Sequence, residues 1–353
     1  MKKIFVAVLA VAAMVACSTE QTIVAPQGEA IGFDTFVENA TRADITTGNL
    51  AEFGVYASIE NANGAGMILT NEKVYKNNDG WKYGNTQYWV PKANYEFTAF
   101  APRTNAELDP AVTAHWTYTP ATTAGNGTVN FKNAVAEANQ DFIFAYATMN
   151  LTNTTELTKS PGVVNFNFAH QLSKITFKFI NEFVAANNIE LRVYNVNVAG
   201  LVSEAKATIA NGGVGAWTKV TPEEGDATFA RTFGTQVAAN AENTATIIAA
   251  GGNSTTDSHY FIPVAGTEYT ISFDVDIIQA GVKVDTYHHT NLKVTPALAK
   301  GGNYVFTTTL DASNVSDDPT KQLYPIEFNV TGVEGWDPAN GNVDVLVPAT
   351  GNN

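Results

Sequence analysis

Cysteine is almost absent from this sequence, since its 353 residues contain a single one, Cys17. A disulfide within the chain is therefore excluded, and stability has to come from buried apolar surface and backbone pairing. Charged residues are also scarce: they make up 15% of the chain, whereas apolar residues make up 45%. This balance argues against intrinsic disorder, which needs low hydrophobicity and high charge. The sequence predicts a folded protein without internal disulfides.

Basic residues are the rarer of the two charges, with 20 Lys and Arg against 34 Asp and Glu, so the formal net charge is −14. The first 42 residues hold three basic and four acidic side chains, which leaves −13 on the rest of the chain. A body of this charge repels phosphate backbones and anionic lipid head groups, and no basic patch offsets it. We expect no nucleic-acid partner.

Catalytic and metal-binding motifs are missing as well. The five histidines are scattered, none lies in an H-E-x-x-H or Cys/His cluster, and no nucleotide-binding loop or G-x-S-x-G elbow is present. Asp274 and Asp276 are spaced i, i+2, which on a strand is more typical of a solvated face than of a glycosidase acid pair. The sequence predicts neither an enzyme nor a bound metal or cofactor.

The N-terminus has the organisation of an export signal. Two lysines precede the apolar run Ile4 to Ala16, which is too short to span a membrane, and no other segment is long enough. The run ends in Met14-Val15-Ala16-Cys17, which resembles a bacterial lipobox with Met14 in place of the commoner leucine. We therefore expect Cys17 to carry lipid. The lipid would hold the precursor on a membrane, because each buried acyl methylene contributes ~0.8 kcal/mol. The alternative, a buried structural cysteine, does not suit a position outside any folded element.

A patterned strand follows a polar linker at residues 18–30. Alternate side chains of IGFDTFV face one way, which predicts a strand; they are Ile31, Phe33, Thr35 and Val37. The stretch closes on Thr41-Arg42-Ala43, where a lone arginine in small, polar surroundings is open to a protease. We interpret a strand between a lipid anchor and a cleavable bond as a temporary part of the protein.

Two more alternating segments lie near the other end of the sequence. The first places Ile326, Phe328 and Val330 on one face, and the second, after a Gly- and Asn-rich turn, does the same with Val343, Val345 and Val347. A hydrophobic strand near a terminus can add to the edge of another sheet.

Short apolar runs punctuated by Gly, Pro and Asn fill the chain between these ends, with no sustained helical periodicity. Their spacing of about 8–12 residues indicates β-sandwiches rather than βαβ units. The length fits two domains of roughly 150 residues each. We predict one domain over residues 43–165 and a second over residues 166–353.

Three short motifs resemble a known family: QYWVP at residues 87–91, FTAFAP at residues 97–102 and FAHQLSKITF at residues 168–177. Taken in order with the lipobox cysteine, the short strand and the Thr-Arg-Ala site, they resemble the Bacteroidales fimbrillins, the FimA-like and Mfa-like pilins of type V pili. The resemblance extends over essentially the whole chain.

The resemblance implies two transthyretin-like β-sandwich domains with an N-terminal removable strand and a C-terminal donor strand. Residues 1–17 would be the lipoprotein signal peptide with the lipidated cysteine, and residues 18–42 a propeptide. The precursor would cross the inner membrane and reach the outer membrane, where an arginine-specific surface protease would cut between Arg42 and Ala43. The strand at Ile31 to Val37 would leave with the lipid, and a neighbour's strand from within Ile326 to Val347 would fill the vacated groove.

The implied function is that of a structural fimbrial subunit in a cell-surface fimbria that supports adhesion. Its partners would be copies of itself or other pilin subunits, and a host or bacterial receptor of unknown identity. A tip or anchor subunit is an alternative, although a cleavable Arg42 disfavours an anchor, which keeps its lipid. A second alternative is a surface lipoprotein that binds glycan through the aromatic residues near Trp81 and Trp89. We favour core packing for these aromatics, because most of them alternate with polar residues.

Overall fold

The computed structural model describes residues 30–37, 45, 48–103, 116–132, 140–155, 157, 161–220, 228–234, 236–237, 245–294, 298–315 and 328–335. At residues 36, 37, 228 and 329–335 the description is of the backbone. Several features expected from the sequence lie outside these residues, namely the signal peptide, Cys17, Arg42, Ala43, Ile326, Val343, Val345 and Val347.

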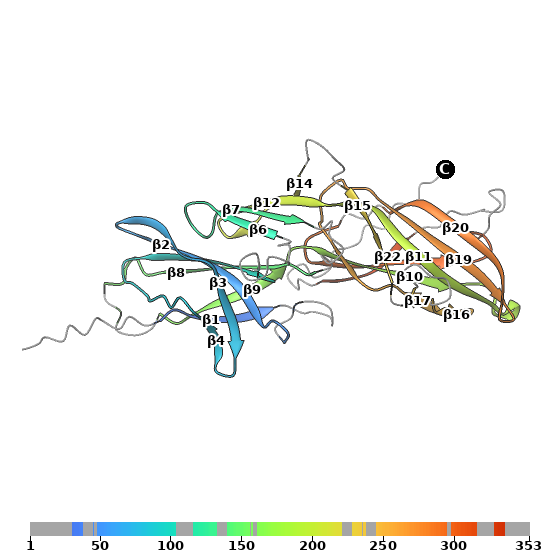
Figure 1. The fold of residues 1–353 in the computed structure, drawn as a ribbon, viewed down its shortest axis with the longest axis horizontal. Coiled ribbons are helices and arrows are strands. Elements are labelled where there is room, and N and C mark those ends of the chain that lie inside the picture. Colours follow the sequence, from blue (N-terminus) through green and yellow to red (C-terminus); the bar gives the residue numbers. More distant parts are fainter. Residues whose placement is uncertain are drawn as a thin grey trace, which may run out of the picture.

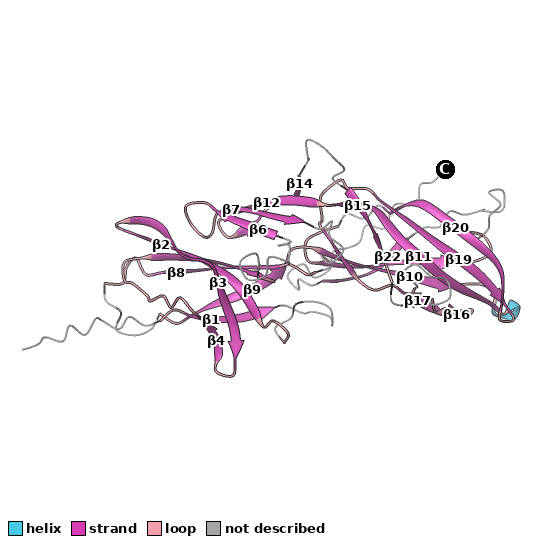
Figure 2. Ribbon diagram, in the orientation of Figure 1, coloured by secondary structure: helices cyan, strands magenta, loops and turns pink. Residues whose placement is uncertain are grey.

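The regular secondary structure of the described residues is almost wholly strand, which confirms the predicted all-β class (Figure 2). Its one described helical segment is a 3-10 turn at Ala185–Asn187. The strands form where apolar and polar residues alternate in the sequence. In Val163–His170, for example, exposed and buried residues alternate without exception. No helix among the described residues has the length and apolarity that crossing a membrane would require.

The first sheet has seven strands and curls around its own core (Figure 1). The core side chains all come from one face of this sheet and from the segments beside it, and Phe53, Phe97 and Phe166 are fully buried there. In spatial order the strands are β1 (Gly32–Val37), β9 (Val163–His170), β8 (Ile143–Asn150), β5 (Asn94–Ala101), β2 (Glu52–Asn61), β3 (Gly64–Asn77) and β4 (Gly80–Tyr83).

A second sheet covers the outer face of the first. Because neighbouring side chains on a strand point to opposite faces, Val55 enters the core of the first sheet while Tyr56 enters a separate core between the two sheets. The strands in order are β13 (Gly213–Val214), β12 (Glu204–Ala210), β7 (Gly127–Lys132) and β6 (Trp116–Pro120), with β14 (Thr218–Lys219) also paired to β12.

The right-hand lobe of Figure 1 contains two sheets that face each other across a third core. One sheet has the order β17 (Asn253–Thr255), β10 (Ser173–Asn181), β21 (Gly302–Leu310) and β22 (Asn329–Gly335), with β18 (His259–Phe261) also paired to β10. The other has the order β15 (Thr228–Thr232), β11 (Ile189–Val202), β19 (Tyr269–Gln279) and β20 (Val282–Val294), with β16 (Ile247–Ile248) also paired to β11.

The strand pairing moves the division of the chain away from the predicted boundary between residues 165 and 166. That boundary falls inside β9, which pairs along its length with β1 in the left-hand lobe. The left-hand lobe also takes up β12, which pairs with β7 and lies well beyond the predicted boundary. An alternating sequence predicts that a strand forms but not which strand it joins. The pairing of β12 with β7 in the left-hand lobe could therefore not be predicted from the sequence.

Candidate strand-exchange groove

Strand β1 occupies the edge of the seven-stranded sheet, parallel to β9. The register places Gly32 beside Val163 and Val37 beside Phe168, so β1 covers most of the length of its partner. The rest of the sheet that holds it, from β9 to β3, is joined by antiparallel pairs. The strand that the sequence predicts at residues 31–37 is therefore present, as an addition to one open edge.

The start of β1 is also held on its other side, by the last residue of β4 and the segment that follows it. The Ile31 backbone N–H donates to the Gln87 carbonyl oxygen at 2.8 Å, and the Tyr83 hydroxyl donates to the Ile31 carbonyl oxygen at 2.8 Å. Ala30 and Tyr88 form an isolated antiparallel bridge at the same place. The two edges of the curled sheet thus meet at β1, which fills the gap between them.

Tyr83 is the side chain that joins the two edges. Its hydroxyl accepts the Gln87 backbone N–H at 3.0 Å while donating to Ile31. Burial raises the pKa of the phenol above its usual range; the Gln87 hydrogen bond opposes this and the nearby charge of Glu72 adds to it. The phenol therefore keeps its proton at neutral pH and remains a donor to the β1 backbone.

The side chains of β1 enter the core from the predicted face. Ile31 and Phe33 are 1% and 6% exposed, and Thr35 is half-buried. The Phe33 ring lies 5.0 Å from that of Tyr83 and stacks on that of Phe166 at 5.8 Å. Burial of an aromatic or large aliphatic side chain contributes about 1.5–3 kcal/mol, so Ile31 and Phe33 each stabilise this edge by an amount of that order. At Val37, the last predicted residue, the backbone pairs with Phe168.

A buried pair of His170 and Asp141 lies at the far end of β9, beside the backbone of Ile45. His170 Nδ1 lies 2.9 Å and 3.0 Å from the two carboxylate oxygens of Asp141, and both side chains are 1% exposed. Asp141 also accepts the Ile45 backbone N–H at 3.0 Å. Ile45 stands two residues after the expected new N-terminus, Ala43. His170 belongs to the family motif at residues 168–177, whereas the only sign of Asp141 in the sequence is its place before the apolar strand β8.

The predicted donor segment is partly paired within its own lobe. Strand β22 runs antiparallel to β21 and forms an edge, with Val330 opposite Phe306. The Phe328 ring, just before the strand, packs 5.6 Å from Phe177 and 6.1 Å from Phe273. In the single chain Phe328 and Val330 therefore complete their own sheet. The other part of the predicted donor, residues 343–347, lies outside the described residues.

The two tryptophans of the glycan-binding alternative are packing residues. Trp89 is 2% exposed, with its ring 4.9 Å from that of Tyr95. The Trp81 ring lies 5.0 Å from that of Phe53. A sugar-stacking platform needs an open ring face, which Trp89 does not offer. Within the described parts of the chain, no group of three or more His, Cys, Asp or Glu side chains is placed to hold a metal ion.

The chain matches the model of the fimbrillin-like family over residues 40–330. Among solved structures it is similar to a fimbrial protein from Bacteroides vulgatus, with 18% identity and a TM-score of 0.57 over 87% of this chain and 99% of that one. It is also similar to a protein described as a cell adhesion protein from Bacteroides uniformis, with 15% identity and a TM-score of 0.46 over 88% and 98%. The fimbrial anchor protein Mfa2 from Porphyromonas gingivalis shares 10% identity, with a TM-score of 0.39 over 86% and 98%. The first of these three similarities supports the fold. No curated protein sequence matches the chain.

Proposed function

This chain belongs to the fimbrillin-like family and is a fimbrial subunit of the cell surface, and on that premise we propose that β1 is a placeholder which a strand from another subunit replaces. Fimbrial subunits assemble with other pilin subunits, and the family is one of structural and adhesion proteins rather than enzymes. The proposal concerns how this chain joins that assembly.

The observation that supports the proposal is the position of β1 between two edges of one sheet. On one side β1 pairs with β9, and on the other Ile31, directly before β1, bonds to the end of β4 and to the segment after it. Without β1, the Val164, Phe166 and Phe168 side chains would line an open groove. Each buried backbone group left unpaired costs about 1–3 kcal/mol, so the vacated groove binds strongly to any strand that restores both the pairing and the apolar side chains.

The sequence beyond β22 is long enough to supply such a strand. Strand β22 ends opposite Gly302, near the junction of the two lobes, because it runs antiparallel to β21. The 18 residues 336–353 span at most ~60 Å when extended at ~3.3 Å per residue. Retracing the nine residues of β21 uses ~30 Å, the length of residues 336–344. The remaining ~30 Å, residues 345–353, exceeds the six residues of β1 and includes the donor valines Val345 and Val347.

Removal of β1 requires a cut after it, and Arg42 is the residue we assign to that cut. The sequence contains four arginines, and the other three are held by the fold. Arg103 donates to the Asn71 carbonyl oxygen at 2.8 Å, Arg192 Nη1 lies 3.7 Å from an Asp276 carboxylate oxygen, and Arg231 is 7% exposed. An arginine-specific protease would therefore make one productive cut, which releases the lipidated Cys17 together with β1.

The same reasoning favours a stalk subunit over an anchor or tip. An anchor keeps its lipid, whereas a cut at Arg42 removes it. A tip subunit needs no donor strand, whereas the valine-rich segment at residues 343–347 has the alternation that a donor requires. The burial of Trp89 disfavours the glycan-binding alternative.

Arg42→Ala is expected to leave the precursor folded and uncut, and to reduce fibres below detection. Arg42→Lys provides the matched control, because it resists an arginine-specific protease but is cut by trypsin. The measurement is negative-stain electron microscopy after treatment with each protease. We expect fibres from Arg42→Lys with trypsin only, and from Arg42→Ala with neither. Fibres from uncut Arg42→Ala would contradict the proposal.

A further inference from the structure

Exposed apolar side chains gather at two places on this molecule. The large hydrophobic residues with more than two-fifths of their surface exposed are Tyr75, Tyr88, Val90, Val163, Val184, Ile247, Val282 and Val284. Apart from Tyr75, which lies on the β3–β4 hairpin, they come from segments around the start of β1 or from the far end of the other lobe. Scattered surface apolar residues need no explanation, but gathered ones mark interaction sites.

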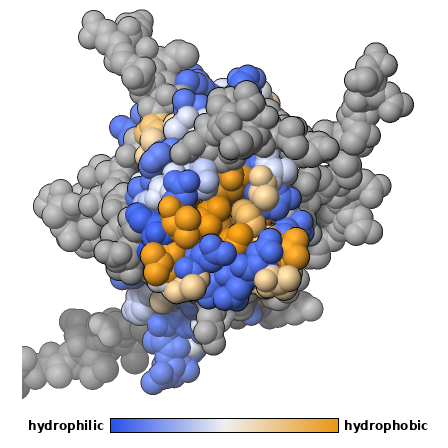
Figure 3. All heavy atoms as spheres, turned by 90° about the vertical axis from the view of Figure 1, so that its right-hand side faces the viewer, coloured by the Kyte–Doolittle hydropathy of each residue, from blue (hydrophilic) through white to orange (hydrophobic). Residues whose placement is uncertain are grey.

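The first group, which we call the tip patch, consists of Val184, Ile247, Val282 and Val284. They come from three segments that the strand pairing brings to one end: the loop after β10, the start of β16, and the β19–β20 hairpin. The exposed residues Ala185, Ala249 and Ala280 lie in the same segments. Figure 3 looks onto this end and shows a hydrophobic patch surrounded by hydrophilic residues.

The second group, the mouth patch, consists of Tyr88, Val90 and Val163. Tyr88 bridges to Ala30 on one side of β1, and Val163 pairs with Gly32 on the other. These side chains are 52%, 44% and 49% exposed in that order. They therefore flank the point where a strand running in the direction of β1 enters the groove.

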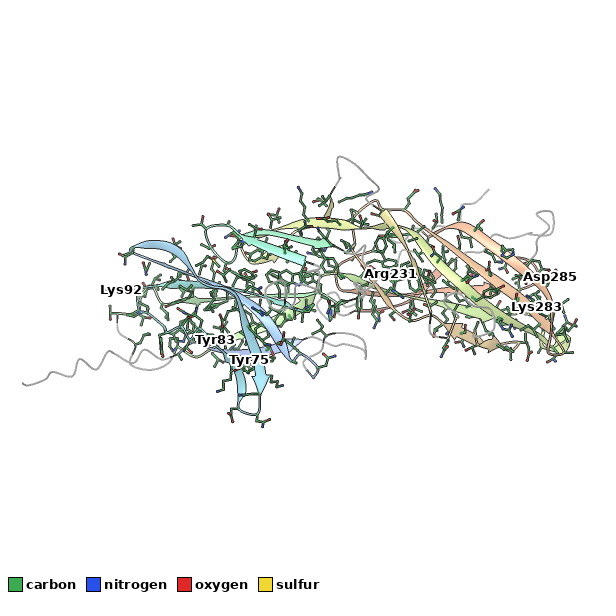
Figure 4. All side chains as sticks on the ribbon, in the orientation of Figure 1. Tyr75, Tyr83, Lys92, Arg231, Lys283 and Asp285 are labelled. Carbon is green, nitrogen blue, oxygen red and sulfur yellow. The ribbon has the colours of Figure 1, made fainter. Side chains whose placement is uncertain are left out.

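The two patches lie at opposite ends of an elongated molecule. Figure 4 shows Lys92, two residues beyond Val90, at the left-hand end, and Lys283 and Asp285, beside the tip patch, at the right-hand end. Contacts between two different surfaces of identical subunits are head-to-tail, and when they do not close into a ring they generate a filament.

We propose that the tip patch of one subunit docks on the mouth patch of the next copy, so that the contact guides the incoming donor strand into the groove. This inference rests on the proposed strand exchange. A donor that leaves the tip end of its own subunit reaches the start of the groove and runs parallel to β9, as β1 does. The two patches thus lie where the ends of neighbouring subunits meet.

The occupant is a second copy, because the proposed strand exchange joins the tip end of one subunit to the groove of the next. The patches alone are too small to hold two copies together. A stable interface buries about 1,200–2,000 Å² in total, and each patch offers only three or four half-exposed side chains. Strand insertion has to supply the remaining contact. The full precursor, whose groove is filled, is accordingly expected to stay monomeric.

Cysteine crosslinking tests the contact, because trimming at Arg42 removes the only native cysteine. Trimmed Val184→Cys protein is mixed with trimmed Val90→Cys protein, allowed to form fibres, and treated with a short bis-maleimide. Thr117→Cys, at an exposed position on β6, replaces Val90→Cys in the control mixture. The readout is the amount of mixed covalent dimer, which mass spectrometry of the crosslinked peptides identifies.

We expect roughly tenfold more mixed dimer with Val90→Cys than with Thr117→Cys, the ratio that a preference of about 1.4 kcal/mol produces. Fibres that give equal amounts from both mixtures would overturn the tip-to-mouth contact and leave strand exchange standing. Fibres in which Val184→Cys crosslinks to neither would show that the tip faces something other than a second copy, which also overturns it. Failure of the trimmed parent protein to form fibres at all would overturn both proposals.

Discussion

Phe33→Ala is expected to destabilise the precursor by about 3 kcal/mol, the lower end of the range for deleting a buried phenylalanine side chain, and to leave the assembled fibre unchanged. In the precursor the Phe33 ring packs against Tyr83 and Phe166, and its removal leaves a cavity. Under the proposal β1 is absent from the fibre, so residue 33 no longer contributes to its stability. Denaturant unfolding of the precursor and heat dissociation of fibres grown from trimmed protein measure the two effects.

Phe166→Ala is the matched control, because Phe166 belongs to β9 and stays in the groove. Its side chain is fully buried and stacks on Phe33. This variant should weaken the precursor and the fibre alike. If Phe33→Ala lowered the dissociation temperature of the fibre as much as Phe166→Ala does, then β1 would be a permanent strand and not a placeholder.

Deletion of residues 343–353 is expected to abolish fibre growth while leaving the thermal midpoint of the monomer within about 2 °C of the parent. Strand β22 (Asn329–Gly335) and its pairing with β21 lie before the deletion and remain. Under the proposal the donor acts in the groove of another subunit, so its loss removes no contact that the monomer needs, and changes away from packed features are normally within about 0.5 kcal/mol. Calorimetry of the precursor and electron microscopy of the trimmed protein provide the two measurements.

A mixing experiment separates loss of the donor from loss of the groove. The deleted subunit keeps a groove, so after trimming it should accept the donor of an intact subunit and then stop growth at that end. Small amounts added to parent protein should therefore shorten fibres. Normal fibres from the deleted protein alone would remove residues 343–353 from the donor role.

Much of this architecture could be predicted from alternation in the sequence. The pattern of Ile31 to Val37 predicts both the strand and its buried face, and Ile31 and Phe33 are buried as expected. The punctuated apolar runs predict the all-β class. These features are local, because a strand with one buried face needs only a period of two.

The pairing partners could not be predicted, because they depend on chain segments far apart. Nothing in Glu204–Ala210 indicates that it joins β7 rather than its sequence neighbours, and this return displaces the predicted domain boundary. Tyr83 and Asp141 are similar cases: each is an unremarkable residue in sequence, and each acquires a role through a backbone group distant in the chain, Ile31 for one and Ile45 for the other.

Hydrogen exchange of assembled fibres, read by peptide mass spectrometry, tests the placeholder role of β1 most directly. Protection of the β9 amides requires a strand beside them, whichever chain supplies it. The account predicts that peptides covering residues 31–37 are missing from the fibre while β9 (Val163–His170) stays as protected as in the precursor. Fibres that retain a protected segment 31–37, or that lack it and leave β9 unprotected, would contradict it.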